Sequence, residues 1–154
     1  MENMGMSGLR IDLKAAMGYG KNALAVSMAI NAAKKGYTLF VTAKDMLNEF
    51  PEYINVQQLP VDNLVELADT VNDRSFVILN PDYLMDRKDS DSVIGFEPLL
   101  TALLSRNAVV LVLSNSSTGL ELECNNPRAR QFLLLGLLGV HLNIEPSIAK
   151  PHCD

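Results

Sequence analysis

The sequence predicts an α/β fold, a three-layer αβα sandwich with a mainly parallel central sheet. Three short uncharged runs, residues 37–43, 76–79 and 109–113, are rich in β-branched or aliphatic residues, as buried parallel strands are. Segments with the apolar spacing of helices lie between them, and strands that alternate with helices are typical of βαβ units. An aliphatic core agrees with this, because 48% of the 154 residues are hydrophobic and Trp is absent.

The N-terminal part of the chain predicts a strand, a tight turn and a helix. Apolar and polar residues alternate over residues 9–13 (LRIDL), which indicates a short strand. Residues 16–20 form a turn of small residues with two glycines. A helix is expected to begin at Lys21 (KNALAVSMAINAAKK) and to end near Gly36, because glycine favours helix C-termini. The expected apolar face of this helix contains Leu24, Met28 and Ala32.

Shorter elements are expected between the first two buried strands. A short helix over residues 44–50 is ended by Pro51, and residues 53–56 predict a brief strand. A further helix is expected over residues 63–71, with Asp62 as its N-cap. The side chains expected on its inner face are Leu64, Leu67, Ala68 and Val71.

The C-terminal part of the chain predicts two more helices and a last strand. Residues 96–105 have helical spacing, and a second helix is expected to run from Asn126 to about residue 138. Glu121 and Glu123 lie between them in what reads as a loop, and residues 141–144 suit a final strand. Residues 8–150 are therefore interpreted as a single domain that follows a flexible leader, residues 1–7.

Charge and cysteine content limit the classes of function. The formal net charge is -5, which argues against tight DNA binding and leaves at most a weak contact, because DNA binders usually carry a basic face. Two cysteines without close spacing give no disulfide framework, and no run is long enough to span a bilayer. A cytoplasmic protein without a membrane segment is the expectation.

The turn after the first strand has the features of a phosphate-binding loop. The known pattern is G-x-x-x-x-G-K-[ST], and Gly20 and Lys21 match it, whereas Ala15 replaces the first glycine and Asn22 the hydroxyl residue. Gly18 and Gly20 allow backbone N–H groups to turn towards an anion, and the helix that follows adds a partial positive charge. The residues expected to contact a nucleotide are Gly18, Tyr19, Gly20, Lys21, Asn22 and Ala23.

Residues 18–50 (GYGKNALAVSMAINAAKKGYTLFVTAKDMLNEF) resemble the phosphate-loop segment of the bacterial helicase-loader and transposition-helper AAA+ ATPases, or a RecA-like relative. That family has a G-x-G-K-T-x-L-A helix, a G-Y-x-V-x-F-x-T-A strand and a D-L-L helix. The matching residues are Gly20, Lys21, Leu24, Ala25, Gly36, Tyr37, Phe40, Thr42, Ala43, Asp45 and Leu47. The resemblance is close over some thirty residues and looser over the next hundred, and it implies a P-loop NTPase-like fold.

The resemblance also implies roles for residues at the ends of later strands. Asn115 takes the place of the asparagine that senses the γ-phosphate, and Asp82 stands in for one of the two acids that follow the third strand in that family. Asn80 and a proline occupy the two acidic positions themselves, and Arg128 and Arg130 are candidate arginine fingers. The implied catalytic residues are Lys21, Asp82 and Asn115, and the implied metal ligands are Asn22 and Asp82.

The departures from the family pattern weaken the chemistry of hydrolysis in particular. Asn22 and Asn80 place neutral amides where Mg²⁺-assisted phosphoryl transfer needs a hydroxyl and a carboxylate. The expected function is therefore a degenerate ATPase-like subunit that binds ATP or ADP, with Mg²⁺ as a further ligand, and hydrolyses it slowly or not at all. It would assist DNA replication, partitioning or transposition with a protein partner such as a helicase, a homologous ATPase or a second copy of itself.

Two other functions remain open at this point. An active Mg²⁺-dependent ATPase of RecA-like or phage-assembly type would use Asn22 and Asp82 as imperfect metal ligands. A nucleotide-free interaction scaffold would keep the fold and lose the ligand.

Overall fold

A computed structural model describes residues 8–16, 20–61, 63–81, 95–115 and 120–124 of the chain. The elements in chain order are β1 (Leu9–Ala15), α1 (Lys21–Lys34), β2 (Thr38–Val41), the 3-10 helix η2 (Lys44–Glu49), β3 (Val56–Gln58), α2 (Leu64–Thr70), β4 (Ser75–Leu79), α4 (Phe96–Ser105), β5 (Val109–Asn115) and β6 (Leu120–Cys124).

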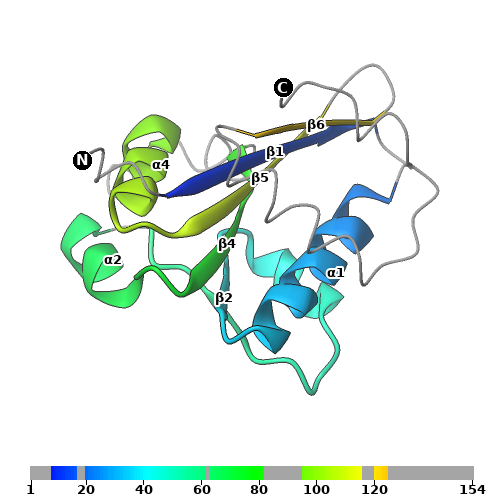
Figure 1. Ribbon diagram of the computed structural model, residues 1–154, viewed down its shortest axis with the longest axis horizontal. Coiled ribbons are helices and arrows are strands. Elements are labelled where there is room, and N and C mark those ends of the chain that lie inside the picture. Colours follow the sequence, from blue (N-terminus) through cyan, green and yellow to red (C-terminus); the bar gives the residue numbers. More distant parts are fainter. Residues whose placement is uncertain (1–7, 17–19, 62, 82–94, 116–119, 125–154) are drawn as a thin grey trace.

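The strands form one six-stranded sheet in the order β3-β2-β4-β5-β1-β6. Every neighbouring pair is parallel except β1 and β6, which run antiparallel at one edge (Figure 1). The prediction of an α/β fold with a mainly parallel sheet is confirmed. The order also places β1 between β5, its parallel partner, and β6.

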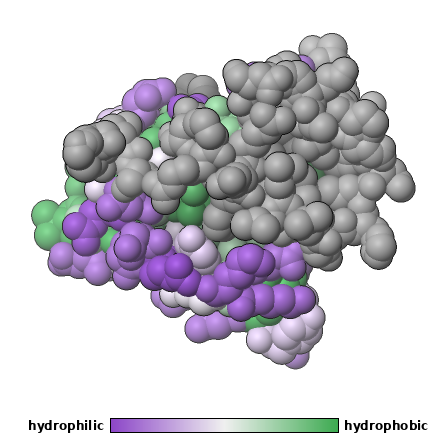
Figure 2. Space-filling view, in the orientation of Figure 1, coloured by the Kyte–Doolittle hydropathy of each residue, from purple (hydrophilic) through white to green (hydrophobic). Residues whose placement is uncertain are grey.

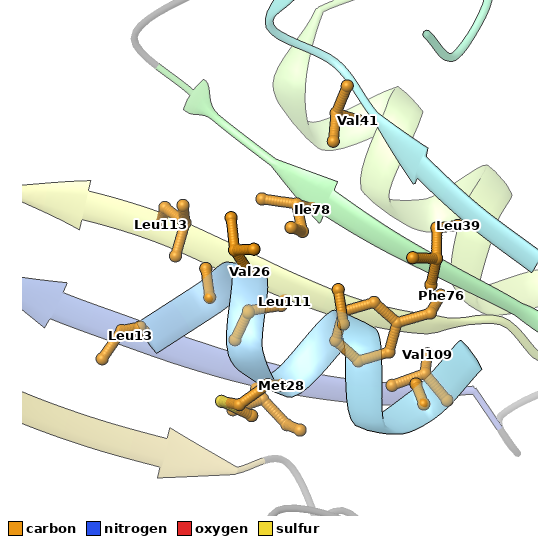
Figure 3. Close-up of a cluster of buried hydrophobic side chains, with 14 of the residues drawn as sticks. Leu13, Val26, Met28, Leu39, Val41, Phe76, Ile78, Val109, Leu111 and Leu113 are labelled. Carbon is orange, nitrogen blue, oxygen red and sulfur yellow. The ribbon is translucent and has the colours of Figure 1, made fainter. Parts of the chain in front are cut away.

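Helices cover both faces of this sheet. Alternate residues of each strand point to opposite faces, so Val109, Leu111 and Leu113 of β5 join the core beneath α1, whereas Val110 and Val112 join the core with α2 and α4. Figure 3 shows α1 lying along the strands, with Val26 and Met28 among the side chains of this first core. Both faces of the central strands are therefore buried, and this explains why their sequences are continuously hydrophobic.

Helix α1 follows its prediction. Leu24, Met28 and Ala32 are buried on the sheet side, with Ala25, Val26 and Ala29 beside them. The chain turns after the helix at Gly36, whose φ of 96° lies in the left-handed region that glycine adopts without a Cβ clash. The helix is therefore fixed against the sheet along its whole length, and its first residue, Lys21, has a defined position.

Several expectations about the shorter elements were wrong. The loop expected around Glu121 and Glu123 is strand β6, which pairs antiparallel with β1. The strand expected over residues 53–56 is instead β3, and only Val56 belongs to both.

Helix α2 also differs from its prediction in its cap and its inner face. Its N-cap is Asn63, whose Oδ1 accepts from the Val65 and Glu66 amides, and not Asp62. Leu67 and Val71 are buried as expected, but Leu64 is 47% exposed and its neighbour Val65 is 72% exposed. Figure 2 shows hydrophobic surface at α2, while most of the described surface in that view is hydrophilic.

The remaining predicted elements lie outside the described residues. These are the leader (1–7), the helix expected from Asn126 and the strand expected over 141–144. Among the helices that the structure describes, none has the length and apolar character needed to cross a bilayer.

Candidate functional site: the junction of β1, α1 and β5

The site lies where the parallel strands end and α1 begins. The chain leaves β1 towards the face covered by α1, whereas α4, the next element after β4 for which bounds are given, packs on the opposite face. In open α/β sheets such a divergence opens a crevice at the carboxyl ends of the strands, and ligands bind there. The strand between β1 and β4 is β5, so its last residues lie at this edge of the sheet.

Gly20 directs the chain into α1. Its φ of 74° and ψ of 28° are left-handed, and its carbonyl accepts the first helical hydrogen bond, from the Leu24 amide at 3.0 Å. A Cβ at this position would meet no other heavy atom within 4 Å, so the glycine is required by backbone conformation and not by crowding. No side chain makes a capping hydrogen bond to the amides of the first helical turn.

Lys21 reaches from the first residue of α1 to the end of β5. Its Nζ donates to the Ser114 carbonyl oxygen at 3.1 Å and to Asn115 Oδ1 at 2.8 Å. The parallel register pairs Ala15, the last residue of β1, with Asn115, so the two strands end level with each other. Two neutral oxygens at the end of β5 therefore hold the ammonium at the carboxyl edge of the sheet.

Asn80 directly follows β4, on the same face of the sheet as Asn115. Phe76 and Ile78 point to the α1 core, and Asn80 is the next residue on that side of the chain. In the same way, Asn115 is the next residue on that side after Leu113 of β5. Leu79 pairs with Val112, so Asn80 stands level with Leu113 on the neighbouring strand. Two amide side chains thus follow the apolar residues of adjacent strands at the α1 face.

Asn80 is held in place by its backbone. Its amide donates to the Thr42 hydroxyl at 2.9 Å, and Thr42, directly after β2, is fully buried. Its side-chain oxygen Oδ1 is buried, and none of the residues that the structure describes donates a hydrogen bond to it. Because such an acceptor costs free energy when it lacks a donor, this oxygen marks a place where a further polar group would fit.

Polar groups continue along the edge as far as β3. Gln58 Nε2 lies 3.4 Å from the Thr42 carbonyl oxygen, at the limit of a hydrogen bond. Gln58 also lines a pocket of about 360 Å³ between β3 and α2, with Glu66 and Thr70 on its far wall. Thr42 and Gln58 were not predicted as site residues. A signal for Thr42 was available, because it directly follows an apolar strand run, as Asn80 does.

The structure brings together two of the predicted catalytic residues, Lys21 and Asn115. Asn22 and Ala23 occupy the first turn of α1, where both are exposed. The predicted residues Gly18, Tyr19 and Asp82 lie outside the described residues, as do Arg128 and Arg130.

The described groups fit an anion better than Mg²⁺. Mg²⁺ in nucleotide sites is held through one or two carboxylates together with phosphate oxygens. β1 ends at Ala15, β5 ends at Asn115 and Asn80 directly follows β4, and none of these three residues brings a carboxylate to this edge. Within the described ranges, three or more His, Cys, Asp or Glu side chains nowhere gather as a metal site would require.

Comparison with known proteins gives no family model that matches the chain, no similar curated protein and no similar solved structure.

Proposed function

We propose that the chain is a degenerate P-loop NTPase-like protein that binds the phosphates of ATP or ADP at the start of α1 and hydrolyses them slowly or not at all. The observation that carries this proposal is the position of the Lys21 ammonium, 2.8 Å from Asn115 Oδ1 at the carboxyl edge of a parallel sheet. The three-layer, P-loop-like interpretation of the fold belongs to the same proposal.

The chemistry of the site favours a phosphate ligand. A left-handed Gly20 leads into an uncapped helix whose first amides carry partial positive charge. The Lys21 ammonium adds a full charge, and hydrogen bonds from an ammonium to phosphate oxygens are among the stronger ones in proteins. Two neutral oxygens from β5 orient this ammonium without cancelling its charge.

The cellular role follows from the resemblance of residues 18–50 alone. On that basis the protein acts in the cytoplasm as an accessory or regulatory subunit in DNA replication, partitioning or transposition. Its partner is a helicase, a homologous ATPase subunit or another copy of the chain, and any direct contact with DNA is weak. An active Mg²⁺-dependent ATPase is less well supported, because Asn22 and Asn80 are amides.

Calorimetric titration with ATP and ADP, in buffer with EDTA and in buffer with Mg²⁺, tests the phosphate site. The informative pair of variants is Lys21→Ala and Lys34→Ala, because each removes one lysine from α1 and Lys34 is exposed in the last turn. Loss of Lys21 is expected to weaken binding about tenfold or more, since a charged hydrogen bond contributes about 1.5–3 kcal/mol. Lys34→Ala is expected to bind as the unaltered protein does. Equal binding by the two variants would remove the phosphate-loop role of Lys21.

A further inference from the structure

Cations gather at the edge of the sheet where the parallel strands begin, opposite to Lys21. The chain enters β2 shortly after Lys35, β4 directly after Arg74 and β5 shortly after Arg106. These three strands are consecutive in the sheet, so the three residues follow one another along its amino edge. Lys34 ends α1 beside them, and all of these side chains are exposed. We call Lys34, Lys35, Arg74 and Arg106 the amino-edge row.

Contacts with neutral groups hold the two arginines of this row in place. Arg74 Nη2 donates to the carbonyl oxygen of Lys35, and Arg74 Cζ lies 4.4 Å from the centroid of the Tyr37 ring. Arg106 Nε donates to the Val71 carbonyl oxygen at 3.2 Å, at the start of the loop that contains Arg74. Both arginines thereby cap a helix, because Lys35 is the C-cap of α1 and Val71 that of α2. A guanidinium has several N–H donors, so each arginine retains donors after this contact.

The positive charge of the row is offset in part. Elsewhere in the fold, Arg10 is paired with Asp12, whose Oδ2 lies 3.0 Å from Arg10 Nε. The cations of the row form no such ion pair with a carboxylate of the residues that the structure describes. Asp69 and Asp73 are exposed nearby, and the end of each helix adds about half a negative charge. The edge therefore remains weakly positive in a chain whose formal net charge is -5.

A row of fixed cations is better matched to a chain of phosphates than to a single anion. Adjacent strands lie about 4.8 Å apart, so the row extends over roughly 10 Å from β2 to β5. One strand of DNA carries a phosphate about every 3.4 Å along the helix axis, so roughly three phosphates match this length. An extended acidic peptide directs successive side chains to opposite sides, so it brings fewer carboxylates to one edge. Arginine also binds phosphate oxygens with two N–H groups at once.

From these observations we infer that the amino-edge row binds the phosphates of nucleic acid. The inference rests on the cellular role in the proposed function, whose weak DNA contact it places, and not on the nucleotide site. Lys21 lies at the carboxyl edge, so the two ligands bind at opposite edges of the sheet. Because the contact uses phosphates, it distinguishes no base sequence and weakens with added salt.

Fluorescence anisotropy of a labelled oligothymidylate, titrated with the full chain from about 50 mM salt upwards, tests the inference. Lys35→Glu and Lys44→Glu are a matched pair, because both lysines are exposed, they flank opposite ends of β2 and each change alters the net charge equally. Lys35→Glu is expected to weaken binding about tenfold, and Lys44→Glu is expected to bind as the unaltered chain does.

Arg106→Gln gives a second measurement that keeps an amide donor near the Val71 carbonyl oxygen and removes the charge. It is expected to reduce the slope of log affinity against log salt by about 0.7, the value of one phosphate contact on a single strand. An unchanged slope would contradict the assignment of Arg106 to the row.

Other outcomes overturn the inference as a whole. Equal weakening by Lys35→Glu and Lys44→Glu would mean that total charge governs binding and not the amino edge. Displacement of the oligonucleotide by polyglutamate as readily as by unlabelled oligonucleotide would indicate an acidic protein as the partner. ATP titration of the same samples separates the two sites. ATP binding without oligonucleotide binding removes the amino-edge contact, whereas oligonucleotide binding without ATP binding supports that contact and removes the nucleotide site.

Discussion

Lys21 and Asn115 are 94 residues apart in sequence, yet Nζ of one lies 2.8 Å from Oδ1 of the other. The contact joins the first residue of α1 to the last residue of β5, two elements that meet because β5 is the parallel neighbour of β1. The ammonium also donates a hydrogen bond to the Ser114 carbonyl oxygen, so a backbone atom as well as the Asn115 side chain fixes its position. A charge fixed in this way loses less conformational entropy when it binds an anion.

Asn115→Ala tests whether this contact orients Lys21 for a ligand. We expect ATP affinity to fall about three- to tenfold, since a hydrogen bond to a charged group contributes about 1.5–3 kcal/mol and this one is partly exposed. Calorimetric titration in EDTA measures the change, and Asn55→Ala, an exposed asparagine at the other end of the sheet, is the matched control. Tighter binding by Asn115→Ala would show that the amide competes with the anion for the ammonium.

Gly20→Ala tests the backbone conformation that leads into α1. Gly20 and Gly95 are both helix N-caps without a side-chain hydrogen bond, but φ is 74° at Gly20 and -71° at Gly95. Alanine in the left-handed region costs about 1–2 kcal/mol, so Gly20→Ala should lower the free energy of unfolding by that much more than Gly95→Ala does. A Cβ meets only an ordinary contact at Gly95, 3.7 Å from Pro98 Cδ. Equal urea midpoints for the two variants would contradict the assigned turn.

The fold was largely predictable because its strands are buried on both faces. Runs such as residues 76–79 and 109–113 contain no polar residue, and such runs indicate central parallel strands. Strand β6 was missed although its sequence, LELEC, alternates apolar and acidic residues as an edge strand does. The N-cap of α2 was placed one residue early because Asp62 and Asn63 are both good caps, and only the structure shows which one accepts the helix amides.

The sequence indicated one residue of the candidate site, Lys21, but not the geometry around it. A glycine-lysine pair between a strand and a helix indicates Lys21 from local pattern alone. Its contact with Asn115 depends on the strand order, which places β5 between β1 and β4. That order involves strands far apart in the sequence, and the periodicity of a single segment contains no such information.

Thr42→Val tests the hydrogen bond that fixes the end of β4. Thr42 is fully buried and its hydroxyl accepts from the Asn80 amide at 2.9 Å, whereas Thr38 is exposed at the start of the same strand. Valine has the same shape without the acceptor, so the Asn80 amide is left unsatisfied at a cost of about 1–3 kcal/mol. Thr38→Val should change the unfolding free energy by less than about 0.5 kcal/mol, as surface substitutions usually do. Similar destabilisation by both would mean that the hydroxyl of Thr42 does not secure this strand end.

Asn63→Ala tests the correction to the cap of α2. Asn63 Oδ1 accepts from the Val65 amide at 2.8 Å and from the Glu66 amide at 3.2 Å, so alanine leaves both donors to water. Loss of an N-cap costs about 1 kcal/mol, and the urea midpoint should fall accordingly with an unchanged m value. Asn63→Asp keeps a side-chain oxygen at the N-terminus of the helix, where a negative charge is also favourable, so it should retain the original midpoint. If alanine and aspartate are equally stable at this position, the cap contributes nothing and the start of α2 is held by the burial of Leu67 and Val71 alone.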